Sequence, residues 1–199
     1  MLRHIFLWAA LTGSLATSGQ QTEVRYLSGR DVDHTVQWDF LCSKGMNSGK
    51  WRKIAVPSCW EQQGFGQYIY GRFYKKSGGK ASDETGLYRY TFQVPDGWRD
   101  KTVQLVFEGV MTDATVTVNG RQAGATHQGG FTAFSYDVSG LVGYGKKNTL
   151  EVAVAKESKD RSVNSAERRA DWWLFGGIYR PVYLRALPKT HIDRVAVDA

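Results

Sequence analysis

The sequence places an acidic residue directly before two tryptophans near its C-terminal end. Asp171, Trp172 and Trp173 open the run DWWLFGGIYRPVYL, which leads into an expected strand. A carboxylate accepts hydrogen bonds from pairs of hydroxyl groups, and a flat indole covers the apolar C–H side of a pyranose ring. These three residues are therefore candidate sugar-binding residues. The alternative is that both indoles belong to the core of the following strand, and the residues by themselves leave that choice open.

The elements that must position this cluster are predicted to be strands. From about Val24 onward apolar and polar residues alternate, and no long stretch repeats apolar residues at helical spacing. The clearest strand runs from Leu87 to Val94, and Asn119-Gly120 predicts a tight type I′ hairpin. Pro181 is expected at a sheet edge or bulge. Further strands are expected at residues 36–41, 52–56, 102–107, 114–118, 131–136, 149–155 and 178–184. About eight short strands with Gly-rich turns predict an all-β, antiparallel sandwich.

Two long connections interrupt the regular spacing of these strands, at residues 61–86 and 156–172. Long structureless loops inside a compact domain are usually functional. The first loop contains five aromatic residues, and the second is polar and ends at Asp171. If both loops lie on one rim of the sandwich, they form an aromatic shelf beside a carboxylate.

The composition indicates one domain with a substantial core, because the chain has 199 residues of which 42% are hydrophobic. The formal charge of +7 raises nucleic acid as a partner, but the charges are spread over separate loops and interleaved with acids, which indicates a solvated surface. The four histidines are scattered and no zinc spacing occurs, so neither a metal nor a cofactor is expected. Cys42 and Cys59 lie in different predicted elements, which leaves their pairing open.

The first eighteen residues have the three-part form of a secretory signal peptide. A basic start at Arg3 is followed by a short apolar run and small residues, with cleavage predicted after Ser18, or alternatively after Ala16. The apolar run is too short to span a bilayer comfortably. We therefore expect export to the periplasm or the extracellular space, with no membrane partner.

Six segments resemble the N-terminal sugar-binding domain of glycoside hydrolase family 2, whose members include β-galactosidases, β-glucuronidases and β-mannosidases. The segments follow the family's order along nearly all of residues 19–188. They read VPSCWEQQGFG from Val56, TGLYRYTFQVP from Thr85, LVFEGVMTDATVTVNGRQAG from Leu105, HQGGFTAFSYDVSGL from His127, NTLEVAV from Asn148 and DWWLFGGIYRPVYL from Asp171.

The resemblance implies a jelly-roll, galactose-binding-like sandwich over residues 19–188. Residues 189–199 would lead into an immunoglobulin-like domain, which the family follows with a (β/α)8 barrel carrying both catalytic glutamates. Retaining hydrolysis needs two carboxyl groups about 5 Å apart, and no glutamate of this chain stands in the barrel context. We therefore expect no catalytic residue here and no hydrolysis by this polypeptide alone. In family galactosidases and glucuronidases, an Asp at the position of Asp171 reaches the sugar in the active site.

The segment between Trp60 and Gly86 departs from the galactosidase pattern, because it contains no Asn where those enzymes usually place a second sugar contact. This departure puts simple β-galactosidase specificity in doubt. The basic residues Arg72, Lys75 and Lys76 would suit an acidic sugar, although a solvated loop is the default explanation. The expected partner is a β-linked carbohydrate, together with a separate or downstream catalytic barrel. Two alternatives remain open: a free-standing lectin-like module, and a structural domain that docks onto a separate catalytic chain.

Overall fold

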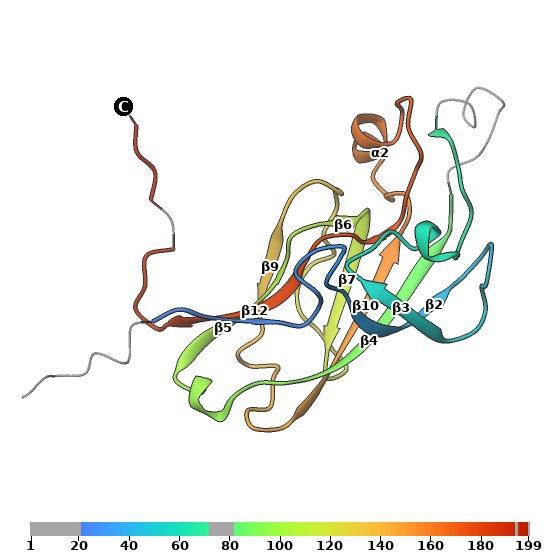
Figure 1. The fold of residues 1–199 in the computed structure, drawn as a ribbon. Helices are drawn as coiled ribbons and strands as arrows, with labels where there is room; N and C mark the ends of the chain where they lie inside the picture. Colours follow the sequence, from blue (N-terminus) through green and yellow to red (C-terminus); the bar gives the residue numbers. More distant parts are fainter. Residues whose placement is uncertain (1–20, 72–81, 194, 199) are drawn as a thin grey trace, which may run out of the picture.

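The computed structural model describes residues 21–71, 82–193 and 195–198. Two antiparallel sheets face each other across the core (Figure 1). The four-stranded sheet has the order β1 (Glu23–Tyr26), β12 (Val182–Pro188), β5 (Lys101–Phe107) and β9 (Phe134–Asp137). The six-stranded sheet has the order β3 (Arg52–Val56), β2 (Val36–Cys42), β4 (Thr85–Gln93), β10 (Lys147–Ala155), β7 (Asp113–Val118) and β8 (Arg121–Gln122). The prediction of an all-β sandwich is confirmed.

The strands with the cleanest alternation form the middle of the larger sheet. Tyr88 and Phe92 of β4 and Val152 and Val154 of β10 point inward and are buried, as the period of two predicts. The Asn119-Gly120 hairpin is confirmed as well. Both of its residues have positive φ, of 51° and 77°, and it joins β7 to β8.

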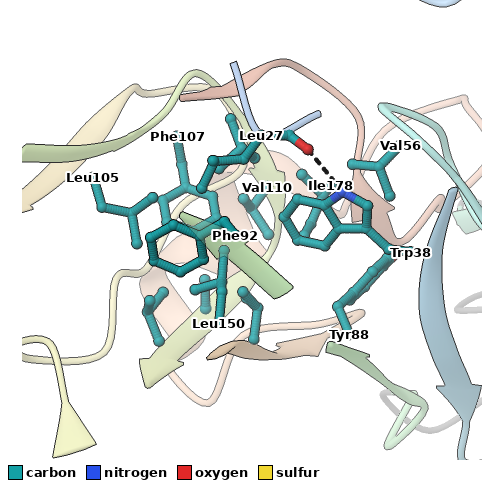
Figure 2. Close-up of a cluster of buried hydrophobic side chains, with 14 of the residues drawn as sticks. Leu27, Trp38, Val56, Tyr88, Phe92, Leu105, Phe107, Val110, Leu150 and Ile178 are labelled. Atoms are coloured by element: carbon teal, nitrogen blue, oxygen red, sulfur yellow. Dashed lines mark hydrogen bonds between the residues drawn. The ribbon is translucent and has the colours of Figure 1, made fainter. Parts of the chain in front are cut away.

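The core fills the space between the two sheets. Figure 2 shows its central side chains, contributed by both sheets and, beside them, by Leu27, Val110 and Ile178. Trp38 is fully buried and donates its indole N–H to the carbonyl of Leu27 at 3.1 Å. That bond satisfies the one polar group of the indole, so the ring packs as an apolar group without a desolvation cost.

The expected strand over residues 178–184 is wrong in its extent. Strand β11 (Gly177–Ile178) pairs with β6 (Val110–Met111) in a separate two-stranded sheet, and β12 begins only at Val182. Pro181 lies in the gap between β11 and β12, because it has no N–H to donate to a ladder. Its carbonyl still accepts a hydrogen bond from the Glu108 N–H at 3.1 Å.

The two long connections carry more regular structure than expected. Residues 61–86 begin with the short 3-10 helix η1 (Glu61–Gln63), and the polar segment 156–172 contains helix α2 (Arg161–Glu167). A second 3-10 helix, η2 (Asp96–Trp98), follows β4. The Asp160 side chain caps α2 by accepting the Ser162 N–H at 2.7 Å. The prediction that 156–172 is a structureless loop is therefore wrong.

Candidate functional site

The two long connections pair with each other at one rim of the sandwich. The N–H of Leu174 donates to the carbonyl of Ile69 at 2.8 Å, and the N–H of Gly71 donates to the carbonyl of Trp172 at 3.0 Å. Tyr70 and Trp173 form an antiparallel bridge between them. Both loops therefore lie on one rim, a condition that the sequence left open. Arg72, Phe73, Tyr74, Lys75 and Lys76, which the sequence analysis also placed in this loop, lie outside the described residues.

Asp171 lies at this rim and is bound by a tyrosine from the other loop. Tyr70 donates its hydroxyl to Asp171 Oδ1 at 2.5 Å and also lies 3.2 Å from the Asp171 carbonyl oxygen. One phenol thus contacts both the side chain and the backbone of the same residue, which restricts the orientation of the carboxylate. A carboxylate can accept about four hydrogen bonds in all, and the Asp171 side chain is exposed.

The two tryptophans are surface residues of a loop. Trp172 is 43% exposed and Trp173 is 48% exposed, and both precede the short strand β11. Their exposure rules out the alternative that both indoles belong to the core of the following strand. It leaves apolar area next to a carboxylate at the rim, the combination that recognises a sugar ring.

Two tyrosine rings pack against the indole of Trp173 and restrict its orientation. The rings of Tyr68 and Tyr70 meet its indole edge-on, with centroids 5.7 and 5.3 Å away. Tyr68 also packs edge-on against Phe175 and donates its hydroxyl to the carbonyl of Glu61 at 3.1 Å. Such edge contacts contribute roughly 0.5–1.5 kcal/mol each beyond the area buried, so the shelf is preorganised.

A buried cluster of charges, formed by Lys156, Glu61 and Glu84, supports the rim from below. The Lys156 ammonium contacts Glu61 Oε1 at 2.6 Å, Glu84 Oε1 at 3.2 Å and the Gln67 carbonyl at 2.5 Å. All three side chains are almost completely buried. These contacts use the three donors of the ammonium group, and they tie the ends of β10 and β4 to both rim segments. Sequence analysis did not single out these residues.

Both carboxylates of the buried cluster have a second donor. Glu61 accepts the N–H of Gly176 at 3.1 Å, and Glu84 accepts the indole N–H of Trp60 at 2.7 Å. Burial raises the pKa of Glu61, and the adjacent Lys156 opposes that rise. The two carboxylates share one cation, but Glu61 is 1% exposed and Glu84 3% exposed. They cannot flank a glycosidic bond, so this pair does not serve as a catalytic acid and nucleophile.

Arg168 joins the second half of the rim to the same buried region. Its guanidinium donates to the carbonyl of Lys156 at 2.6 Å, to the carbonyl of Phe175 at 3.0 Å and to the hydroxyl of Thr112. Burial lowers the pKa of Arg168, and nearby carboxylates, first among them Glu157, oppose that effect. An arginine keeps its charge in a protein, so its donors remain available to order the chain before Asp171.

The remaining candidate features are simple to place. Cys42 and Cys59 are both free thiols, and burial raises the pKa of each to about 11. Within the residues that the structure describes, no group of three or more His, Cys, Asp or Glu side chains could hold a metal ion. In the same part of the chain, no helix is long and apolar enough to cross a membrane.

Comparison with known proteins gives consistent results. The family described as "Glycosyl hydrolases family 2, sugar binding domain" matches residues 36–188. A β-galactosidase of Thermoanaerobacter pseudethanolicus is 40% identical over 109 residues, covering 54% of this chain and 14% of that protein. A β-glucuronidase of Bacteroides fragilis is 29% identical over 164 residues, covering 82% of this chain and 22% of that protein.

A solved structure gives the same picture. The β-glucuronidase of Bacteroides uniformis superimposes with a TM-score of 0.60 at 27% identity, covering 84% of this chain and 18% of that one. This chain therefore spans less than a quarter of the length of these three relatives.

Proposed function

This chain belongs to glycosyl hydrolase family 2, of which it carries the sugar-binding domain, and from that membership we propose that its rim forms part of a glycoside subsite. Asp171 accepts hydrogen bonds from hydroxyl groups of a β-linked sugar, and Trp172 and Trp173 cover the apolar side of the sugar. The observation that carries the proposal is the exposed Asp171 carboxylate, held at 2.5 Å by Tyr70 beside two half-exposed indoles.

The catalytic step belongs, in this proposal, to a barrel that the described residues do not include. Asp171 then supplies one wall of a pocket that the barrel completes. A few exposed contacts support only weak binding, so the isolated chain is expected to bind a methyl β-glycoside with a Kd on the order of 1 mM. The relatives named above are β-galactosidases and β-glucuronidases, which makes these two sugars the first candidates.

An NMR titration of the chain with methyl β-galactoside and methyl β-glucuronide tests the proposal. We expect shifts of the Trp172 and Trp173 indole signals and a loss of affinity of at least about tenfold in Asp171→Ala, because each charge-assisted hydrogen bond contributes roughly 1.5–3 kcal/mol. Asp100→Ala is the matched control. The Asp100 side chain is 98% exposed, and the residue belongs to neither of the two loops that form the rim.

The outcomes separate the alternatives. Unchanged affinity in Asp171→Ala would remove the proposed role of that residue. Micromolar affinity of the isolated chain would favour a free-standing lectin. No shift of the indoles with either sugar would favour a domain that only docks onto a catalytic chain.

Export is also part of the proposed function. It is supported by the sequence of residues 1–18, which lie outside the described part of the chain. The intact mass of the protein recovered from the medium or periplasm should correspond to a chain that starts at Gly19. Recovery only from the cytoplasm, with Met1 or Leu2 as the first residue, would contradict export.

A further inference from the structure

The outer face of the six-stranded sheet is hollowed along its middle strands. Two cavities of about 350 and 240 Å³ adjoin there, and both are lined by Thr115 and Ala153. Their linings come mainly from β4, β10 and β7, which lie side by side in the larger sheet (Figure 1). Asp171, Trp172 and Trp173 line neither cavity. We call the two hollows together the outer groove.

The strand register explains why the outer groove has a low floor. Leu41, Leu87, Ala153 and Thr115 stand opposite one another on four neighbouring strands and form one row across the sheet. The exposed Ala153, at the centre of the row, projects only a methyl group. At about 4.8 Å between strands the row is about 14 Å long, the length of a short oligosaccharide.

A row of taller, charged side chains borders the outer groove, and Arg89 and Glu151 of this row line the smaller hollow. The larger hollow is lined by one acid and one base, Asp113 and Lys159. The bordering row, next to the floor along the strands, contains Lys53, Asp39, Arg89 and Glu151. Lys53 contacts Asp39 at 2.7 Å, and Arg89 contacts Glu151 at 2.9 Å. Because each charge has its counter-charge within the row, the row favours a ligand that is itself uncharged.

The outer groove also offers the two contacts that a sugar requires. Trp51 is 45% exposed at one end, and the guanidinium of Arg89 lies 4.8 Å from its ring centroid and holds the indole in position. On the floor, the hydroxyls of Thr115 and Thr126 lie 2.9 Å apart. One of the two hydroxyls donates its hydrogen to the other, so the second hydroxyl can donate its own hydrogen to a ligand.

Two other classes of occupant fit the outer groove less well. A peptide that binds as an added strand needs an unpaired sheet edge, whereas β4 and β10 are each paired on both sides. A folded partner needs roughly 800 Å² of surface on each side, so it would have to cover the sheet well beyond the row of about 14 Å that forms the floor. From the low floor, the paired charges, the exposed indole and the hydroxyls, we propose that the outer groove is a second carbohydrate site, which binds a neutral oligosaccharide.

NMR titration of the full chain with neutral β-1,4-linked hexasaccharides of glucose, xylose and mannose tests this site. We expect at least one of them to shift the amides of Leu87, Thr115 and Ala153 and the Trp51 indole, with a Kd on the order of 0.1–1 mM. Ala153→Arg fills the floor from an exposed position and should weaken binding at least about tenfold. Thr91→Arg is the matched control, because Thr91 is exposed on the same strand as Leu87 but lines neither hollow.

The results also distinguish this site from the rim. Shifts in the outer groove should persist in Asp171→Ala, whatever that variant does to the rim. The proposal is overturned if none of the three hexasaccharides shifts the outer groove, or if their shifts are confined to residues 171–173. It is also overturned if Ala153→Arg binds as tightly as Thr91→Arg, or if an unrelated peptide produces the same shifts as the sugars.

Discussion

Replacing Lys156 by methionine is predicted to destabilise the domain strongly at neutral pH. Methionine keeps an unbranched apolar chain like the stem of the lysine but removes the ammonium that contacts Glu61 at 2.6 Å and Glu84 at 3.2 Å. Each glutamate retains one neutral donor, from Gly176 or Trp60, which does not replace a cation. Breaking a fully buried ion pair costs about 3–5 kcal/mol, a large fraction of the roughly 5–15 kcal/mol that stabilises a typical domain.

Urea unfolding followed by tryptophan fluorescence measures this loss. Burial already raises the pKa of Glu61 in the folded protein, and removal of Lys156 raises it further. A carboxyl group with a raised folded pKa contributes stability that is present below its unfolded pKa of 4.5 and is lost as pH rises through the folded value. The destabilisation by Lys156→Met should therefore be largest at pH 7 and should shrink as the pH falls towards 5.

Two further variants complete the test. Adding Glu61→Gln to Lys156→Met removes one unpaired charge, so the double variant should lose at least about 1 kcal/mol less than the sum of the two single losses. Lys53→Met is the surface control, and its exposed pair with Asp39 should contribute less than about 1 kcal/mol. The reasoning is refuted if Lys156→Met loses no more stability than Lys53→Met, or if its loss does not change between pH 7 and pH 5.

Two other changes test the packing around the rim and the core. Burial raises the pKa of the Cys42 thiol from 9.0 to about 11, so the free energy of unfolding should fall by up to about 2.7 kcal/mol as pH rises from 9 to 11. Urea midpoints of Cys42→Ala should fall less over the same pH range. An identical fall in the variant and the parent protein would contradict this cause. In Gly176→Ala the new Cβ would lie 2.1 Å from the buried Trp60 ring, which should cost about 1–3 kcal/mol in thermal or urea unfolding. Gly140→Ala, which meets nothing within 4 Å, should be nearly neutral, and equal losses in the two variants would show that the clash is relieved without cost.

Strands were predictable where the two faces of a sheet meet different surroundings. Strands β4 and β10 alternate buried and more exposed positions along most of their length, so their sequence pattern predicts each of them to within two residues. All four residues of β1 are exposed, so the alternation of polar and apolar residues in Glu23–Tyr26 does not mark a buried face. Helix α2 buries no residue either, so its sequence has no helical period; the one available signal was Asp160, two residues before Ser162, as an N-cap.

The composition of the rim was easier to predict than its contacts. The sequence identifies Asp171 and the two tryptophans by type and spacing, but Tyr70 is 101 residues away and was one of several aromatic residues in its loop. Only the pairing of the two loops in the folded chain shows that Tyr70 is the aromatic residue that contacts Asp171. The comparisons extend the sequence reasoning to the family, which the six motifs had indicated.

The buried cluster was missed although strand parity contained the signal for it. Leu150, Val152 and Val154 point inward along β10, and the same period of two places Lys156 inward just beyond the strand. Tyr88 of β4 points inward, and the same period of two places Glu84, just before the strand, on the inward side as well. A charge at an inward position next to a strand was counted as part of a solvated loop, because composition gives no indication of a distant partner.

The pairing of β1 with β12 determines where the domain can be cut and rejoined. Glu23 stands opposite Ala186, so the two ends of the sandwich leave the smaller sheet at the same end of its strands, away from the rim (Figure 1). A short connector between these ends, with new termini at the exposed Asn119-Gly120 turn, would give a circular permutant that keeps the strand ladders joined. For the same reason the domain can be inserted as a unit into another protein at a single surface loop, with the rim of Asp171 directed away from the host.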